Sequence, residues 1–219
     1  MKEYKLPIGC DVPETIILAD GDFPSHPLAL EWLRQCPYVV CCDGAANTYI
    51  RSGRMPEAIV GDGDSLLPDI KERYASLIHS EAEQETNDLS KAFRFCLSQE
   101  RKRITIMGAT GKREDHTIGN VSLLADYMEQ AEVSMMTDYG IFVPIREDSM
   151  FESYIGQQIS VFNMNSTALS AEGLAYPLSV FTNWWQGTLN EALARHFIIR
   201  TEGKVLVFRV GIFSKCSSF

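Results

Sequence analysis

Residues 58–66 read Ala58-Ile59-Val60-Gly61-Asp62-Gly63-Asp64-Ser65-Leu66. An apolar run typical of a buried strand leads directly into two carboxylates, Asp62 and Asp64. Side chains two residues apart in an extended chain point the same way, so these carboxylates repel each other unless a cation lies between them. Mg²⁺ prefers oxygen ligands and often binds one or two carboxylates together with substrate phosphates. The stretch therefore predicts a metal and phosphate site at the carboxyl end of a strand, where open α/β sheets bind their ligands.

Two alternatives to this metal site follow from the same residues. Asp and Gly are common turn residues, so the stretch is also compatible with a solvated loop. A calcium loop of the EF-hand kind is not favoured, because the twelfth position from Asp62 is Arg73, where that loop needs a bidentate Glu.

The first 137 residues alternate between apolar runs and helical spacing. The helix predicted for residues 88–98 has Leu89, Ala92, Phe93 and Cys96 on one face, with Asn87 or Asp88 as its N-cap. Further helices are predicted at about 27–36 and 115–130. The apolar runs, each ending at Gly or Asp, lie at residues 15–19, 38–42, 58–60 and 104–107. This alternation predicts an α/β fold with a mostly parallel open sheet and flanking helices.

The pattern changes near residue 138. Beyond it the apolar runs are short, glycines separate them, and no convincing helix of a dozen residues is present. We therefore expect two domains, an α/β domain at 1–137 and an all-β sandwich or barrel at 138–219, with no sheet continuing through the boundary.

Composition narrows the range of partners. The net charge is −9 and the densest basic run is only residues 101–103, so a nucleic-acid partner is not expected. No apolar run approaches the roughly 20 residues needed to span a bilayer. The N-terminus is polar and no C-x-x-C motif occurs, so we expect no signal peptide and a cytoplasmic location.

Three more polar clusters accompany the Asp62/Asp64 pair. Residues 43–47 are small enough for a ligand to approach the backbone, or they form a capped helix start. Residues 83–88 carry three acids that either complete a cation site or form a solvated turn. Residues 108–116 form a Gly-rich turn with Lys112 and Arg113, which suits phosphate oxygens, although it is neither a Walker A loop nor a Rossmann fingerprint. Together the four clusters predict phosphoryl transfer.

Taken in order, these segments resemble the thiamine pyrophosphokinase family. The family's D-G-(G/A)-A-N motif is matched by residues 43–47, and its G-D-x-D-S motif by residues 61–65. Its acidic stretch before a helix corresponds to residues 83–88, with Glu twice for Asp and Asn87 for Thr. Its G-G-R-x-D-H-x-x-x-N motif corresponds to residues 111–120, with Lys112 for the second Gly. Its G-T-S-N motif corresponds to residues 187–190, with Leu189 for Ser.

The resemblance implies a homodimer of an α/β catalytic domain and a β-sandwich domain. It implies transfer of pyrophosphate from ATP, the co-substrate, to the hydroxyl of thiamine, with AMP released. Asp62, Asp64 and Asp88 are expected around Mg²⁺ and, with Arg113, form the catalytic set. The residues expected at the nucleotide are Asp43, Gly44, Asn47, Ser65, Gln84, Gly111, Asp115, His116 and Asn120. One of the carboxylates near Mg²⁺ is expected to accept the hydroxyl proton.

The acceptor site is expected in the second domain. Thiamine is a cation with flat rings, so an aromatic wall suits it, and Trp184 and Trp185 are candidates unless they belong to the sandwich core. Thr188 and Asn190 complete this set by motif position. Two other functions fit the same residues: an ATP-dependent pyrophosphokinase with a different alcohol acceptor, and a non-catalytic thiamine or nucleotide sensor.

Overall fold

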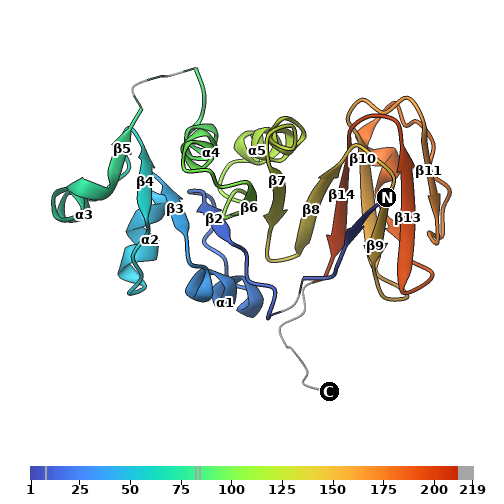
Figure 1. Cartoon of the computed structure of the whole chain (residues 1–219), viewed down its shortest axis with the longest axis horizontal. Coiled ribbons are helices and arrows are strands. Elements are labelled where there is room, and N and C mark those ends of the chain that lie inside the picture. Colours follow the sequence, from blue (N-terminus) through green and yellow to red (C-terminus); the bar gives the residue numbers. More distant parts are fainter. Residues whose placement is uncertain (8, 82, 84, 212–219) are drawn as a thin grey trace.

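The computed structural model describes residues 1–7, 9–81, 83 and 85–211 of the 219-residue chain. A sheet of ten strands runs along the length of the molecule (Figure 1). Helices cover both faces of one half of this sheet, and a second sheet of four strands packs against the other half. The predicted fold class, an open α/β sheet with a C-terminal β-sandwich, is confirmed.

Six neighbouring strands of the large sheet are parallel, in the order β7-β6-β2-β3-β4-β5. Every residue of β2, β3 and β4 is buried, as expected for parallel strands covered on both faces. The strands are β2 (Thr15–Leu18), β3 (Val39–Cys42), β4 (Ala58–Gly61), β5 (Ile78–Ser80), β6 (Arg103–Met107) and β7 (Glu132–Met136).

The helices divide between the two faces of the parallel strands. Successive strand residues point to opposite faces, so Ile16 packs with α1, α2 and α3, whereas Ile17 packs with α4 and α5. The helices are α1 (Pro27–Gln35), α2 (Ala45–Arg51), α3 (Pro68–Arg73), η1 (Ala75–Leu77), α4 (Asp88–Ser98) and α5 (Glu114–Tyr127). The bounds predicted for α4 are confirmed, and Asn87 is its N-cap. None of the helices in the described part of the chain is long and apolar enough to cross a membrane.

The remaining strands form the β-sandwich. The large sheet continues antiparallel through β8 (Gly140–Ile145), β14 (Val205–Val210), β10 (Gln158–Asn163) and β12 (Asn190–Glu191). The second sheet contains β1 (Lys2–Tyr4), β9 (Ser149–Glu152), β13 (His196–Thr201) and β11 (Leu169–Glu172). Buried side chains from both sheets, among them Val143, Phe151, Val161 and Phe197, form the core between them. The turn η2 (Trp184–Gly187) packs on β10.

The boundary predicted between residues 137 and 138 is not a break in the sheet. β7 and β8 pair antiparallel, with Met135 opposite Phe142 and Met136 opposite Ile141. A tight turn joins them, in which the Thr137 N–H donates to the Gly140 carbonyl at 2.9 Å. The expectation that no sheet continues here was wrong, because this turn adds the next strand to the same sheet edge. The first residues of the chain also cross the predicted boundary, since β1 pairs with β9.

Arg209 on β14 ties β1 to the sandwich. Its guanidinium donates to the backbone carbonyls of Tyr4 (3.3 Å), Lys5 (2.8 Å) and Glu152 (2.9 Å), and it lies 5.2 Å from the centre of the Phe151 ring. The side chain is buried, and this burial lowers the pKa of Arg209 to about 10. It remains charged at neutral pH, so three carbonyl dipoles compensate a buried cation.

We expect Arg209→Met to lower the free energy of unfolding by about 2–4 kcal/mol, because three buried carbonyls lose their donor. Arg200→Met is the matched control. Arg200 is exposed on β13 and pairs with Asp148 and Glu172, so its loss is expected to change the free energy of unfolding much less than the loss of Arg209. Urea unfolding of both variants measures the difference. Equal stability of the two variants would contradict the role given to Arg209.

Candidate active site

Loops that follow β2, β3, β4 and β6 meet at the carboxyl edge of the parallel sheet, together with the start of α4. Three close approaches define this edge. The Ser65 N–H donates to Asp43 Oδ2 at 2.9 Å. A Cβ placed on Gly61 would lie 2.8 Å from Asp43 Cβ and 3.4 Å from Asp88 Cγ, and one on Gly44 would lie 2.7 Å from Asp20 Oδ2. The edge therefore gathers the carboxylates of Asp20, Asp43 and Asp88, from three elements, around glycines.

Asp43 is the buried member of this group. Only 4% of the residue is exposed, and its Oδ1 has no hydrogen-bond partner. Burial raises the pKa of Asp43, and the nearby carboxylates of Asp88 and Asp62 raise it further, against the opposing effect of the Ser65 hydrogen bond. A buried carboxylate with a free oxygen and acidic neighbours has a local excess of negative charge.

Asp62 and Asp64 lie on the exposed loop after β4. The Asp64 N–H donates to Asp62 Oδ1 at 3.0 Å, so one of the two carboxylates folds back on its own loop. Within the described ranges, no group of three or more His, Cys, Asp or Glu side chains is close enough together to hold a metal ion. The predicted set of Asp62, Asp64 and Asp88 is thus near one edge but is not a preformed ligand cage.

Asp88 begins α4 and has a cation beside it. Lys91, one turn later, is buried, and its Nζ lies 3.2 Å from Asp88 Oδ1. The N-cap Asn87 accepts from the Ser90 N–H and donates to Asn120 Oδ1 at 3.1 Å. Asn120 in turn donates to the Ala109 carbonyl at 2.8 Å. Asn120 therefore links the start of α4 to the loop after β6.

The acidic segment before α4 has hydrogen-bond and ion-pair partners of its own, away from the carboxylates of this edge. Glu83 accepts from the Thr86 N–H and hydroxyl and pairs with Arg94 at 2.9 Å, and Arg94 also pairs with Glu81. These partners give the segment a structural role of its own. The predicted nucleotide contact Gln84 lies outside the described residues.

The loop after β6 presents two cations in different directions. Arg113 folds back on Asp115, with Nη2 to Oδ2 at 2.5 Å, and both side chains are exposed. This hydrogen bond lowers the pKa of Asp115 to about 2. Lys112 instead reaches the loop after β2, where its Nζ lies 3.0 Å from Asp20 Oδ1. His116 is exposed at the start of α5.

Asp20 and Asp22 were missing from the predicted site. They lie after β2 in the motif Asp20-Gly21-Asp22, which has the same alternation as the motif after β4. The loops after β2 and β6 are joined by hydrogen bonds from the Gly21 N–H to the Gly108 carbonyl (2.6 Å) and from the Asp22 N–H to the Thr110 carbonyl (2.8 Å). The Asp-Gly-Asp pattern after an apolar run, repeated at residues 62–64, is the sequence signal that could have identified this loop.

The residues predicted for the acceptor lie on the sandwich. Trp184 contacts the edge of Phe162 on β10 (centroids 6.1 Å apart), whereas Trp185 is 73% exposed. Thr188 donates its hydroxyl hydrogen to the Trp185 carbonyl at 2.7 Å. Asn190 is buried, and its amide bonds to both the N–H and the carbonyl of Tyr176 (3.0 and 2.8 Å). In this structure Asn190 positions the neighbouring loop, and the tryptophans are the accessible groups.

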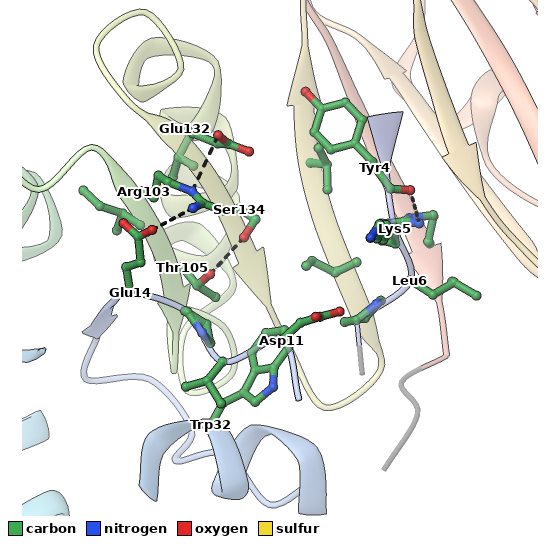
Figure 2. Close-up of a pocket in the computed structure, with 18 of the residues that line it drawn as sticks. Tyr4, Lys5, Leu6, Asp11, Glu14, Trp32, Arg103, Thr105, Glu132 and Ser134 are labelled. Carbon is green, nitrogen blue, oxygen red and sulfur yellow. Dashed lines mark hydrogen bonds and ion pairs between the residues drawn. The ribbon is translucent and has the colours of Figure 1, made fainter. Parts of the chain in front are cut away.

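A cavity of about 570 Å³ lies elsewhere, over the amino ends of β6 and β7 (Figure 2). Trp32 of α1 and residues 3–7 contribute to its wall. Thr105 and Ser134, whose hydroxyls are 3.2 Å apart, also line it. None of the predicted site residues lines this cavity, so it is separate from the carboxyl edge.

Comparisons with known proteins agree with this arrangement. Residues 29–136 match a family model described as "Thiamin pyrophosphokinase, catalytic domain", and residues 140–208 match one described as "Thiamin pyrophosphokinase, substrate-binding domain". The chain belongs to the thiamin pyrophosphokinase family. The catalytic-domain match contains the clusters after β3, β4 and β6 and the start of α4, and the substrate-binding match contains Trp184 to Asn190.

Individual members of the thiamin pyrophosphokinase family resemble the chain at moderate identity. Thiamine pyrophosphokinase 1 of Oryza sativa subsp. japonica is 30% identical over 129 residues, which cover 48% of this chain and 49% of that protein. Thiamine pyrophosphokinase of Bacillus subtilis is 34% identical over 86 residues, which cover 37% of this chain and 40% of that protein. The matched segments thus span about half the length of these curated relatives or less.

Solved thiamin pyrophosphokinase structures share the fold over nearly the whole chain. The Bacillus subtilis structure has a TM-score of 0.75 at 20% identity and covers 90% of this chain and 98% of its own. The yeast structure has a TM-score of 0.77 at 16% identity, and the match covers 96% of this chain and 91% of the yeast chain.

The raised pKa of Asp43 predicts how stability depends on pH. The folded protein retains a proton on Asp43 above the pH at which the unfolded chain loses it, so unfolding free energy falls as pH rises from about 4 through the folded pKa. Asp43→Asn is expected to remove this part of the decline. The exposed Asp69→Asn is the control with the same charge change. Urea unfolding between pH 4 and 8 checks this, and parallel pH profiles for parent and Asp43→Asn would contradict it.

Proposed function

We propose that this protein is a thiamine pyrophosphokinase, which transfers pyrophosphate from ATP to the hydroxyl of thiamine and releases AMP. The observation that carries the proposal is the Asp43 carboxylate, buried with a free oxygen beside Asp88 and Asp62, in a chain of this family. In the reaction the thiamine oxygen bonds to the β-phosphorus, and the bond from that phosphorus to the α,β-bridging oxygen breaks. The hydroxyl proton passes to a carboxylate of the site.

The residues at the edge fit a magnesium ion. The unpartnered Asp43 oxygen and the mutual repulsion of the neighbouring acids are what a divalent cation would relieve. We propose that Asp62, Asp64 and Asp88 hold Mg²⁺. When bound, the ion neutralises charge on the phosphate oxygens.

We propose that the nucleotide lies across the loops after β3, β4 and β6. Asp43, Gly44, Ser65, Gly111, Asp115, His116, Asn120 and Gln84 are the proposed contacts, with Arg113 as the cation that stabilises charge in the transition state. Asn47 supports this site through the loop after β4, because it donates to the Ser65 carbonyl and accepts from the Leu67 N–H. Arg113 can bind phosphate only if its ion pair with Asp115 breaks. Breaking this pair costs little, because both side chains are exposed to solvent.

We propose that thiamine binds at Trp184, Trp185, Thr188 and Asn190, and that a second copy of the chain completes the site. β10, beneath Trp184, is seven strands from β4 in the sheet. At about 4.8 Å per strand this is on the order of 30 Å. Reacting atoms must approach to about 3–3.5 Å. A homodimer that brings the tryptophans of one copy to the acids of its partner removes this separation.

Two further proposals concern the roles of the two halves of the chain and the location of the protein. We propose that residues 1–137 act mainly in nucleotide binding and residues 138–219 in acceptor binding, although one sheet joins them. We also propose a cytoplasmic location, which would supply the ATP that the reaction consumes.

Asp62→Asn is expected to lower kcat by at least about 100-fold while the protein stays folded, because an exposed carboxylate needed for charge compensation is lost. The assay measures AMP and thiamine diphosphate formed from ATP, Mg²⁺ and thiamine. Asp69→Asn, on the exposed side of α3, is expected to keep parental activity. Near-parental turnover of Asp62→Asn at saturating Mg²⁺ would rule out the metal role, and an inactive parent protein would rule out the function.

Mixing two defective proteins tests whether two copies share one site. Asp62→Asn is expected to be inactive, and Trp185→Ala is expected to have about 10-fold lower activity at limiting thiamine. If each site combines acids from one copy with tryptophans from the other, co-refolding equal amounts should restore about a quarter of parental activity, since half of the dimers contain one intact site. Recovery of only the mean of the two separate activities would show that each chain works alone.

A second candidate, transfer to a different alcohol, is favoured by one observation. The Asn190 amide is already bonded to Tyr176, so less polar recognition remains for thiamine. Measuring AMP release with other alcohols in place of thiamine distinguishes the two functions.

A further inference from the structure

Lys112 points into the carboxyl edge of the sheet, whereas its neighbour Arg113 does not. The Lys112 ammonium lies 3.0 Å from Asp20 Oδ1, on the loop of the adjacent strand β2. Arg113 is paired within its own loop. The two consecutive cations therefore have different surroundings, and only the first lies between two strand ends.

Lys112 lies at the point of the large sheet where the strand order reverses. β3, β4 and β5 follow β2 on one side, and the chain then returns to the other side with β6 and β7. Ligands of open α/β sheets bind in the crevice that this reversal leaves at the carboxyl ends. Lys112 and Asp20 come from the two loops, after β6 and β2, that border this crevice.

The loops that carry the pair fit together closely. A Cβ on Gly21 would lie 2.3 Å from the Thr110 carbonyl oxygen, and one on Gly111 would lie 2.1 Å from Asp22 Oδ2. The backbone of Lys112 itself is left-handed, with φ +55°. This conformation is unfavourable for lysine, and the surrounding loops hold it there. The side chain of Lys112 thus starts from a fixed point and is directed at the crevice.

The ammonium of Lys112 has capacity for another acceptor. Lys91 is buried against Asp88, and Lys71 donates to the Gly63 carbonyl at 2.9 Å. The Lys112 side chain is 53% exposed and its Asp20 partner 44%. An ammonium has three donors, and an exposed pair of this kind contributes little to stability. A phosphate group can therefore replace or join Asp20 at small cost.

We propose that Lys112 binds the phosphates of the nucleotide, and that Asp20 is the partner that holds its ammonium over the crevice when no nucleotide is bound. This rests on the proposed function, because it assigns an additional cation to the same ATP site. The acids at this edge, Asp20, Asp43, Asp62 and Asp88, repel the phosphates of a nucleotide, and the Lys112 ammonium offsets part of this repulsion.

Calorimetric titration of the full-length protein with ATP and Mg²⁺, without thiamine, tests the proposal. Lys112→Ala is expected to raise the Kd for ATP about 10- to 100-fold, as for loss of a charge-assisted hydrogen bond. Lys112→Gly removes the same side chain and suits the left-handed backbone, so it guards against a folding defect. Lys112→Arg is expected to recover part of the affinity. Lys102→Ala, at the other end of the same strand, is the control and should bind like the parent.

Two measurements separate phosphate binding from a structural effect. Adenosine has no phosphate, so its affinity should be the same for parent and Lys112→Gly. In steady-state assays the KM for ATP should rise while the KM for thiamine stays within about twofold. An equal loss of adenosine and ATP binding overturns the proposal, as does parental ATP affinity in both Lys112→Ala and Lys112→Gly.

These outcomes distinguish the inference from the function on which it rests. If the parent forms AMP and thiamine diphosphate but Lys112 variants bind ATP normally, only the role of Lys112 fails. If the parent neither binds ATP nor forms AMP, the proposed function fails and the role of Lys112 fails with it.

Discussion

Repulsion among carboxylates at one edge of the parallel sheet is the constraint that shapes this protein. Parallel pairing brings the ends of β2, β3 and β4 together, and each of these strands is followed by aspartate. Asp43 is buried there, and its burial, together with the nearby carboxylates of Asp88 and Asp62, raises its pKa. The neighbouring cations Lys91 and Lys112 each compensate one acid, and the glycines allow the loops to approach. The charges at this edge therefore affect the stability of the fold as well as the binding proposed for it.

The sequence predicted the local elements and the loop positions well. Apolar runs and helix caps carry local information, so α4 and the strand ends near Asp62 were correct. The pairing of β1 with β9, almost 150 residues away, was missed because it depends on tertiary contacts that periodicity does not report. Asp20 was missed for the same reason: its partner Lys112 is adjacent only once β2 and β6 pair. The pairing of β7 with β8 is local, and it was missed because the turn between them was interpreted as a domain boundary.

The sequence predicted that acids meet at this edge of the sheet, but it did not predict where their side chains point. The acids at Asp43, Asp62 and Asp88 do collect at one edge, as parallel strands require. Side-chain directions were not predictable, since they depend on local partners. Arg113 turns to Asp115, and the Asn190 amide turns to Tyr176, although both residues match motif positions. A motif therefore indicates which residues lie near one another in the fold, but not which partners their side chains take.

The hydrogen bonds between β7 and β8 make the two halves of the molecule mechanically one body. A hinge at residues 137–140 would have to break a strand pair, so domain closure around a substrate is not available to a single chain in the way it is to proteins with a flexible linker. Separation of the halves would also leave β7 and β8 as bare sheet edges, which promote aggregation. The two halves are therefore expected to unfold as one unit, even though their sequences match separate family models.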